Sequence, residues 1–338
     1  MYPNNNIDSE QVMSISDTTI KSQLTYPLAH YLNQHSPLVY GCMGLGGGWN
    51  TNPITAEDIK QTQAIMEFCL EQGVKIFDHA DIYTFGKAER AFGQVLKQAP
   101  SLRDQMSIQS KCGIRFADEK GGKRYDFSAQ WITHSVEQIL QRLHIDQIDV
   151  LLLHRPDPLM QLDELAQTLI ALNAEGKIAH IGVSNMHTAQ LAFLQSALPM
   201  PIVANQIELS LAKPGFINSS IEPSHNYDGV AEYAQQHNVQ IQAWGALAQG
   251  QFTKEMNHDV SMNVQHTSNM IMQLAQQYDV SREAVVLAFL TRHPVAIQPI
   301  IGTTNLARIE ACAQVTQCQL SAVDWYGLLE SSRGTEVP

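Results

Sequence analysis

Cysteine is scarce in this chain, and the few that occur are scattered. Five cysteines stand among 338 residues, at positions 42, 69, 112, 312 and 318, and no two of them form a C-x-x-C pair. The odd number and the wide spacing argue against a disulfide framework and against a zinc or redox motif built on paired thiols. We therefore expect reduced, mostly structural thiols in a cytosolic protein.

Positive charge is also in short supply. There are 21 lysines and arginines against 33 aspartates and glutamates, which gives a formal net charge of −12. Polyanions repel an acidic chain of this kind, so we expect no nucleic-acid partner and no anionic membrane surface. Any anionic ligand has to be held by a local site.

Long apolar runs are missing from the sequence. No segment approaches the ~18 consecutive apolar residues of a membrane-spanning helix. Residues 1–22 lack both the basic start and the apolar stretch of a secretory signal, and nothing in them repeats at helical or strand period. We expect a cytoplasmic location, a loosely ordered extension over residues 1–22 and one folded domain over residues 23–338.

The chain does contain a regular alternation of strand-like and helix-like segments. Hydrophobic residues make up 44% of it, which is enough for a large buried core. From residue 38 onward, short apolar β-rich runs recur, each followed by a segment of helical periodicity. The eight runs are 38–43, 74–78, 106–111, 148–154, 178–184, 201–206, 239–244 and 295–301.

This alternation predicts parallel strands covered by helices, and eight units is the number that closes a (β/α)8 barrel. An open doubly wound sheet is the competing architecture, and it normally carries a G-x-G-x-x-G turn after an early strand. The segment GLGGGW at 44–49 has Trp49 in place of the last glycine. The sequence therefore favours an α/β fold of the TIM-barrel type, as a single domain.

Capping signals support the helical segments. Thr55 with Asp58 three residues later resembles a capping box, and Gly73 ends that segment. Ser128 precedes a second amphipathic segment, and Gly176 follows a third. Helix and strand are therefore expected to alternate along the chain.

Ionisable residues follow three neighbouring strands. The second strand ends in Asp78 with Tyr83 in the next loop, the third ends in Lys111, and the fourth ends in His154. Each alone is more often a solvated loop residue or a satisfied core residue than a catalyst. The chemistry of a (β/α)8 barrel lies at the carboxyl ends of its strands, so these four side chains are expected to meet.

Such a set has a specific chemistry. Tyrosine, with a reference pKa of ~10, is protonated at neutral pH, and it becomes a useful acid when a nearby cation stabilises its phenolate. Lys111 can be that cation, Asp78 can supply its counter-charge, and His154 can orient a substrate oxygen. The set holds neither a nucleophile nor an electron source. It therefore indicates a cofactor that carries hydride.

Later strand ends offer partners for that cofactor. Ser184, Asn185 and Gln206 provide hydroxyl and amide groups suited to a carboxamide, and Trp244 provides a flat face for stacking a ring. By themselves these residues are more typical of ordinary strand-end polarity and a core aromatic than of a cofactor site. Their position at the same predicted barrel mouth favours the cofactor.

The segment after the eighth strand has the features of a phosphate site. Thr303, Thr304 and Asn305 open a helix, and Arg308 lies one turn along. A helix N-terminus presents free backbone N–H groups, and the hydroxyls and the arginine add further donors. Phosphate sites are frequent at this place in barrels of this type.

In this order and spacing, the motifs resemble those of the aldo-keto reductases over residues 38 to about 315. FDHADIYTFGKAE matches the signature around that family's catalytic Asp and Tyr, and eight ordered motifs are more specific than any one of them. The motifs are GLGGGW, FDHADIY, SKCG, LLLHRPD, GVSN, NQIE, AWGALAQG and IIGTTNLARI.

The resemblance implies an enzyme that binds NADP(H) without a Rossmann domain and reduces an aldehyde or ketone to an alcohol by hydride transfer. It makes Tyr83 the general acid, Lys111 the residue that lowers its pKa, Asp78 the partner of Lys111, and His154 the residue that orients the carbonyl. The cofactor-binding positions that it implies are Ser184, Asn185, Gln206, Trp244, Gly245, Leu247, Gly302, Thr303, Thr304 and Arg308.

Two positions depart from the family's pattern. Gly302 stands where many members carry a lysine, so one cation of the site for the 2′-phosphate is missing and the preference for NADPH over NADH is less secure. Trp244 stands where tyrosine is commoner, which is conservative because stacking needs only the ring.

Two other functions fit parts of the pattern. A redox-sensing regulatory subunit, like the potassium-channel β subunits, would hold the same cofactor with little turnover, but we expect no partner-binding N-terminal helix here. A metal-dependent hydrolase could use Asp78, His79, Asp81 and His154. Lys111 stands where a further ligand would be needed, and no H-x-H pair ends a strand, so we regard His79 and Asp81 as loop structure.

The substrate pocket is expected to come from variable loops that contain Trp49, Phe85 and the segment 210–228. The predicted partner is a small carbonyl compound, whose identity the loops do not reveal. Nothing in the sequence requires more than a monomer.

Overall fold

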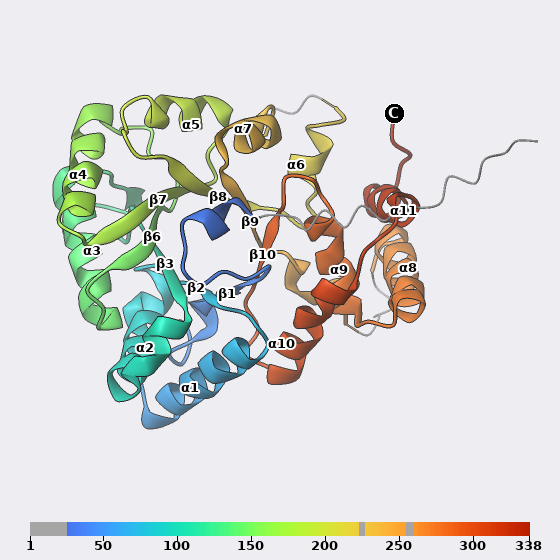
Figure 1. The fold of residues 1–338 in the computed structure, drawn as a ribbon, viewed down its shortest axis with the longest axis horizontal. Helices are drawn as coiled ribbons and strands as arrows, with labels where there is room; N and C mark the ends of the chain where they lie inside the picture. Colours follow the sequence, from blue (N-terminus) through green and yellow to red (C-terminus); the bar gives the residue numbers. More distant parts are fainter. Residues whose placement is uncertain (1–25, 223–226, 255–259) are drawn as a thin grey trace, which may run out of the picture.

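Eight parallel strands close into a barrel surrounded by helices (Figure 1). The computed structural model describes residues 26–222, 227–254 and 260–338, so the extension predicted for residues 1–22 lies outside the described residues. Around the barrel the strands follow the order β1-β10-β9-β8-β7-β6-β3-β2, each hydrogen-bonded to the next. The predicted barrel is confirmed, and the open doubly wound sheet is excluded.

The barrel strands lie where the apolar runs predicted them, with ends that differ by a few residues. Their bounds are β1 Val39–Gly41, β2 Ile76–Asp78, β3 Ser107–Cys112, β6 Ile148–Leu153, β7 Ile178–Ser184, β8 Ile202–Glu208, β9 Gln240–Trp244 and β10 Gln298–Ile301. The first is shorter than the run at 38–43, because the chain turns into a 3-10 helix at Cys42–Gly44.

One ring of helices covers the outside of the barrel, and α8 and α11 lie side by side beyond it (Figure 1). The ring comprises α1 Ala56–Glu71, α2 Lys87–Gln98, α3 Ala129–Leu143, α4 Leu162–Ala174, α5 Thr188–Gln195, α7 Val230–His237, α9 Arg282–Thr291 and α10 Leu306–Ala313. The additional helices are α6 Gly215–Asn218, α8 Met262–Tyr278 and α11 Ala322–Arg333.

Two of the predicted helix starts have the expected caps. The Asp58 side chain accepts from the backbone N–H of Thr55 at 2.7 Å, and the Thr55 hydroxyl accepts from the N–H of Asp58 at 3.2 Å, which makes a complete capping box. Ser128 caps α3 through its hydroxyl oxygen, which accepts from the N–H of Trp131 at 3.3 Å.

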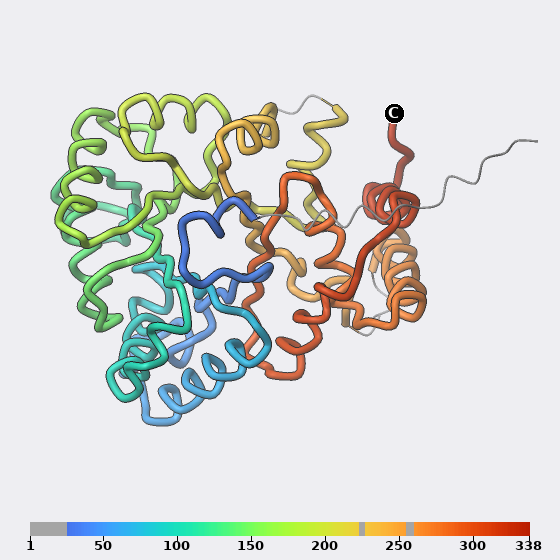
Figure 2. The backbone as a smooth tube through the Cα atoms, viewed as in Figure 1, coloured from blue at the N-terminus to red at the C-terminus, as the bar shows by residue number. Residues whose placement is uncertain are grey.

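A short N-terminal segment covers the opening at the amino ends of the strands. Residues 26–37 run across this end of the barrel before β1 begins, in dark blue (Figure 2). Leu28 is fully buried against side chains of the barrel interior such as Val150 and Leu152. The barrel is therefore closed at its amino end, and any cavity has to open at the carboxyl ends of the strands.

The loop after β3 contains a hairpin that the apolar pattern did not predict. Strands β4, Ile114–Arg115, and β5, Arg124–Tyr125, pair antiparallel beside the barrel mouth. Two-residue strands are too short to show a period of two in the sequence.

Among the described helices, none has the length and apolar character needed to cross a membrane.

Candidate active site

A cavity of about 770 Å³ opens at the carboxyl ends of the strands. It is lined by every predicted site residue except Lys111 and Thr304: Asp78, Tyr83, His154, Ser184, Asn185, Gln206, Trp244, Gly245, Leu247, Gly302, Thr303 and Arg308. Lys111 is fully buried behind this wall. Because the strands are parallel, residues far apart in the sequence meet at one face.

Lys111 connects the residues at the inner end of the cavity. Its ammonium donates to Asp78 Oδ2 at 2.7 Å, to the carbonyl of His79 at 3.0 Å and to the hydroxyl oxygen of Tyr83 at 2.8 Å. These three bonds use all of the hydrogens of the ammonium group. The hydrogen of Tyr83 is consequently free to point at another acceptor.

The protonation states agree with this arrangement. Burial lowers the pKa of Lys111, but the neighbouring Asp78 and Tyr83 outweigh it and hold that pKa above its ordinary value. Burial raises the pKa of Tyr83, although the charge of Lys111 acts to lower it. Lys111 therefore acts to lower the pKa of Tyr83, as predicted, but burial raises that pKa by more. Tyr83 keeps its proton at neutral pH.

His154 faces Tyr83 across the cavity, with the two rings edge to face and their centroids 6.0 Å apart. Its pKa lies well below the ordinary value because of burial and the positive charges of Lys111, Arg155 and Lys123. Its Nδ1 has no hydrogen-bond partner among the described residues. A neutral imidazole can donate one N–H to a substrate oxygen.

Asp78 is held by a chain of buried amides inside the barrel. Gln109 donates to Asp78 Oδ1 at 2.6 Å, and Gln206 donates to the same oxygen at 3.1 Å. Gln109 and Gln242 exchange two bonds at 2.9 Å, and Gln242 donates to Gln298 Oε1 at 3.0 Å. We call Gln109, Gln242 and Gln298 the glutamine chain; it ends where Gln298 donates to the carbonyl of Ser36 at 2.6 Å.

The loop that carries Tyr83 is conformationally unusual. Thr84, Phe85 and Gly86 follow Tyr83 with φ angles of 47°, 60° and 78°, in the left-handed region that non-glycine residues rarely adopt. The Thr84 hydroxyl accepts from the N–H of Ala88 at 3.0 Å, which joins the loop to α2. Successive left-handed residues persist only when the surroundings determine them.

Beneath this loop lies a buried ion pair. Arg142 Nε donates to Glu89 Oε2 at 2.6 Å, and the Glu89 side chain has no exposed surface. The Ser110 hydroxyl donates to the other Glu89 oxygen at 2.7 Å, next to Lys111 on β3. The pair therefore joins α2, α3 and β3 directly under the Tyr83 loop.

Of the two residues that we regarded as loop structure, His79 is buried and Asp81 is half-buried. The His79 ring packs edge to face on Phe92, with the centroids 4.6 Å apart, and burial lowers its pKa to about 3. Burial and the charge of Glu89 raise the pKa of Asp81 to about 8. Within the described residues, no three His, Cys, Asp or Glu side chains are placed to hold a metal ion.

The polar groups on the predicted cofactor side form one chain. The indole N–H of Trp244 donates to Asn185 Oδ1 at 3.1 Å, Asn185 donates to the Ser184 hydroxyl at 2.7 Å, and Ser184 donates to the carbonyl of Gln206 at 2.8 Å. Asn185 is in the left-handed region, with φ 59°. This edge offers both donors and acceptors to a carboxamide.

The segment after β10, which we predicted to be a phosphate site, opens a helix. Asn305 caps α10, and its side chain accepts from the N–H of Arg308 at 3.2 Å. Thr303, Arg308 and Lys254 line this part of the cavity. Cations and a helix N-terminus suit the phosphates of a dinucleotide, and the Trp244 ring and the amide edge suit its nicotinamide.

Several residues that line the cavity were not predicted from the sequence. Of the three segments predicted to form the substrate pocket, only the one with Trp49 lines this cavity. Trp49 lines the cavity, but Phe85 and the described residues of 210–228 do not. Lys123, Tyr125 and Arg155 do line it. Arg155 follows His154 directly, so its position was a usable signal, whereas Lys123 and Tyr125 depend on the unpredicted hairpin.

Comparison with known proteins gives a consistent result. The model of the Aldo/keto reductase family matches residues 37–330. The chain is 36% identical to a 6-dehydroglucose reductase of Agrobacterium fabrum, over 89% of this chain and 96% of that protein. It is 36% identical to the oxidoreductase YdhF of Escherichia coli, over 82% of this chain and 90% of that one.

Solved structures share the fold. A glycerol dehydrogenase from Gluconobacter oxydans, AKR11B4, superposes with a TM-score of 0.73 at 23% identity, over 89% of this chain and 93% of that one. An aldo-keto reductase from Klebsiella pneumoniae, solved with NADPH, superposes with a TM-score of 0.66 at 24% identity, over 89% of this chain and 92% of that one.

Proposed function

The chain belongs to the aldo/keto reductase family, and from that premise we propose that it is an NADPH-dependent carbonyl reductase in which Tyr83 is the general acid. It reduces an aldehyde or ketone to an alcohol, and the same site can run the oxidation in reverse. The observation that carries this proposal is the three-way contact of Lys111 with Asp78, His79 and Tyr83.

The roles follow from that contact. The Tyr83 hydroxyl accepts a bond from Lys111, so its own proton is available to a carbonyl oxygen in the cavity. As the proton leaves, the ammonium 2.8 Å away stabilises the phenolate. Asp78 keeps the buried ammonium neutralised. The N–H of His154 orients the carbonyl oxygen beside Tyr83.

The nicotinamide of NADPH, when bound, supplies the hydride. Ser184, Asn185 and Gln206 would hold its carboxamide, and Trp244 would stack on its ring. Gly245, Leu247, Gly302, Thr303, Thr304 and Arg308 would hold the remainder of the cofactor. The structural neighbour solved with NADPH supports this choice of cofactor. Arg308 and Lys254 are the cations available for a 2′-phosphate, since position 302 is glycine.

The substrate is a small carbonyl compound. Two curated relatives, from Agrobacterium fabrum and Novosphingobium aromaticivorans, are named 6-dehydroglucose reductase, so a sugar aldehyde belongs among the compounds to be tested here. The cavity of about 770 Å³ lies in the size range of small-molecule sites. The monomeric state stays a prediction.

An NADPH-oxidation screen over aldehydes, diketones and quinones tests the proposal. Tyr83→Phe should bind NADPH as tightly as the wild type, judged by fluorescence, and should lose at least about 100-fold in kcat. Unimpaired turnover in Tyr83→Phe would contradict the assigned role. Tight NADPH binding without turnover on any compound, together with a stable stoichiometric partner, would favour a redox-sensing regulatory subunit instead.

A further inference from the structure

We propose that Lys123 and Arg155 form an anion-binding subsite that selects carbonyl substrates carrying a carboxylate or phosphate group. The inference rests on the proposed carbonyl reduction and adds the chemical class of the substrate. Both side chains line the cavity that also contains Tyr83 and His154.

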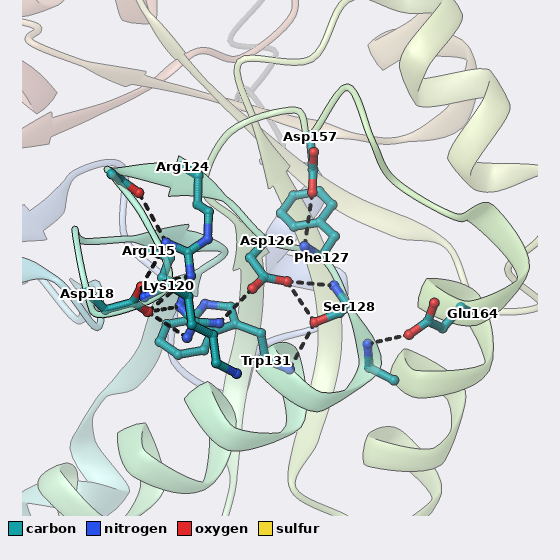
Figure 3. A network of polar contacts seen from close by, with 12 residues as sticks. Arg115, Asp118, Lys120, Arg124, Asp126, Phe127, Ser128, Trp131, Asp157 and Glu164 are labelled. Atoms are coloured by element: carbon teal, nitrogen blue, oxygen red, sulfur yellow. Dashed lines mark hydrogen bonds and ion pairs between the residues drawn. The ribbon is translucent and has the colours of Figure 1, made fainter.

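Neighbouring loops carry the two cations. Arg155 follows His154 at the end of β6, and Lys123 lies just before β5 in the hairpin that follows β3. β3 and β6 are adjacent in the barrel. The backbone N–H of Phe127 donates to Asp157 Oδ2 at 3.0 Å, which ties the loop after the hairpin to the loop that contains Arg155 (Figure 3).

Two of the three acids in the hairpin are paired with arginines, and the third, Glu119, forms no ion pair with Lys123 among the described residues. Asp118 forms ion pairs with Arg115 at 2.6 Å and with Arg124 at 3.0 Å. Asp126 pairs with Arg115 at 2.9 Å (Figure 3). Charge-assisted bonds to arginine are strong and fix the geometry of both partners. Asp118 and Asp126 therefore serve the structure of the hairpin itself, and Lys123 forms no ion pair with any residue that the structure describes.

Arg155 is likewise without an acidic partner among the described residues. The nearby Asp157 accepts the N–H groups of Phe127 and Leu159, at 3.0 and 2.9 Å. The guanidinium of Arg155 lies over the Trp244 ring, 5.4 Å from its centroid. A ring face attracts a cation but does not cancel its charge.

The acid at the end of β8 is also engaged, since Glu208 pairs with Lys213 at 2.5 Å. Of the acids that the structure describes, two line the cavity, Asp78 and Glu283. Asp78 is neutralised by Lys111, and Glu283 lies in the first turn of α9, away from the hairpin. In a chain of net charge −12, two cations that have no ion pair within the described part of the chain are a specific feature beside the reacting groups.

The positive charges of Lys123 and Arg155 act on His154, one of the reacting groups. Lys123 and Arg155 both act, after burial and Lys111, to lower the pKa of His154. Lys123, Arg155 and His154 also line the same cavity, so one small molecule can present a carbonyl to the imidazole and an anionic group to the cations. Such a substrate is attracted by the local field and oriented at both ends.

The chemistry of the surrounding wall favours an anion over a neutral polyol. Lysine and arginine are donors without acceptor groups, whereas each hydroxyl of a sugar both donates and accepts. The neighbouring lining residues Trp49, Ile82 and Ile114 offer no side-chain acceptor. A carboxylate or phosphate is an acceptor, and the polar side chains of this wall, Lys123, Arg155 and the Tyr125 hydroxyl, can all donate to it.

Matched substrate pairs test the proposal. Values of kcat/KM with NADPH would be measured for 4-formylbenzoate against its methyl ester, and for glyceraldehyde 3-phosphate against glyceraldehyde. The wild type should prefer the anionic member of each pair. Arg155→Gln should lower kcat/KM for the anionic member by about tenfold or more, mainly through KM, and should change the neutral member less than about twofold.

Lys123→Gln serves as a second variant, because its exposed side chain can be replaced without disturbing the fold. It should reduce the preference by a few-fold. Lys120→Gln is the matched control, since Lys120 lies in the same hairpin but lines a separate groove with Trp131 and His134. The control should leave both substrate pairs unchanged.

Several outcomes would overturn the subsite. The wild type could show no preference for the anionic member, or Arg155→Gln could weaken glyceraldehyde as much as its phosphate, in which case the cations serve hydroxyl groups. If no aldehyde is turned over, the proposed function fails separately. Calorimetric titration with 4-formylbenzoate then decides: binding that Arg155→Gln abolishes supports the subsite, and no binding to the wild type refutes it.

Discussion

Arg142 and the fully buried Glu89 form an ion pair of 2.6 Å directly beneath the loop that carries Tyr83. The carboxylate of Glu89 has no exposed surface, and its second oxygen is bonded to Ser110. An ideal Cβ on Gly86 would lie 3.1 Å from Arg142 Cδ, so the loop rests closely on the arginine side chain. The ion pair therefore supports the position of the loop that carries Tyr83, and it does not contact the substrate.

Arg142→Met should destabilise the protein and slow its chemistry. The substitution leaves a buried carboxylate without its partner, which typically costs about 3–5 kcal/mol. The relaxed loop should lower kcat while KM for NADPH stays nearly constant. Urea unfolding and steady-state kinetics measure the two effects. Lys177→Met removes surface pairs with Glu137 and Glu175 and should cost at most about 1 kcal/mol, without a change in kcat.

Asp81→Asn should change how stability depends on pH. The pKa of Asp81 is raised to about 8 by burial and by Glu89, so the carboxyl is protonated in the folded protein and ionised in the unfolded chain between about pH 4 and pH 8. The unfolded state then binds fewer protons, and stability falls as pH rises, by up to about 1.4 kcal/mol per pH unit.

The asparagine variant should lose less stability than the wild type across this window, as measured by urea unfolding at pH 5, 6, 7 and 8. Glu89, whose pKa is also raised, remains in both proteins. Parallel pH profiles for the two proteins would show that Asp81 is ionised in the folded state.

Gln242→Leu should cost about 2–4 kcal/mol, since the buried carbonyl oxygens of Gln109 and Gln298 would each lose a donor. Asp78 would keep its bonds from Lys111 and Gln206. We expect thermal unfolding to detect the loss. Gln141→Leu, on the exposed surface of α3, is the control and should change stability by less than about 0.5 kcal/mol.

Gly93→Ala tests the contact of α2 with the end of α3. Helix propensity alone predicts a gain of about 1 kcal/mol from alanine. A Cβ at Gly93 would, however, lie 2.1 Å from the carbonyl oxygen of Arg142, so we expect a net loss of about 1–3 kcal/mol or more. Gly122→Ala meets nothing within 4 Å and should be neutral. A stabilised Gly93→Ala variant would mean that the helices lie further apart.

The sequence predicted the barrel and most of its site because both depend on local pattern. Apolar runs located the strands, and parallel strands end at one face, so Asp78, Lys111 and His154 could be placed together without coordinates. The support of the site was not predictable in the same way. Arg142 lies on a different helix from Glu89, and their contact depends on how α2 packs on α3.

The pairing of charged side chains near the cavity could not be predicted from the sequence either. Arg155 and Asp157 are two residues apart, so their sequence positions suggest an ion pair. In the folded loop, however, Asp157 accepts hydrogen bonds from backbone N–H groups. The pKa of Tyr83 is another such case, because the sequence revealed the neighbouring lysine but not the depth of burial that outweighs it.

The glutamine chain has a consequence for where protons can travel. Asp78 Oδ1 accepts from Gln109 and Gln206, and Oδ2 accepts from Lys111, so every neighbour already presents a hydrogen to it. A proton that reached Asp78 would find no acceptor to pass it to, and amides do not carry protons onward at neutral pH. A proton on Asp78 therefore cannot be passed on through the barrel interior. Whatever replaces the proton that Tyr83 gives up has to arrive from the open mouth of the cavity.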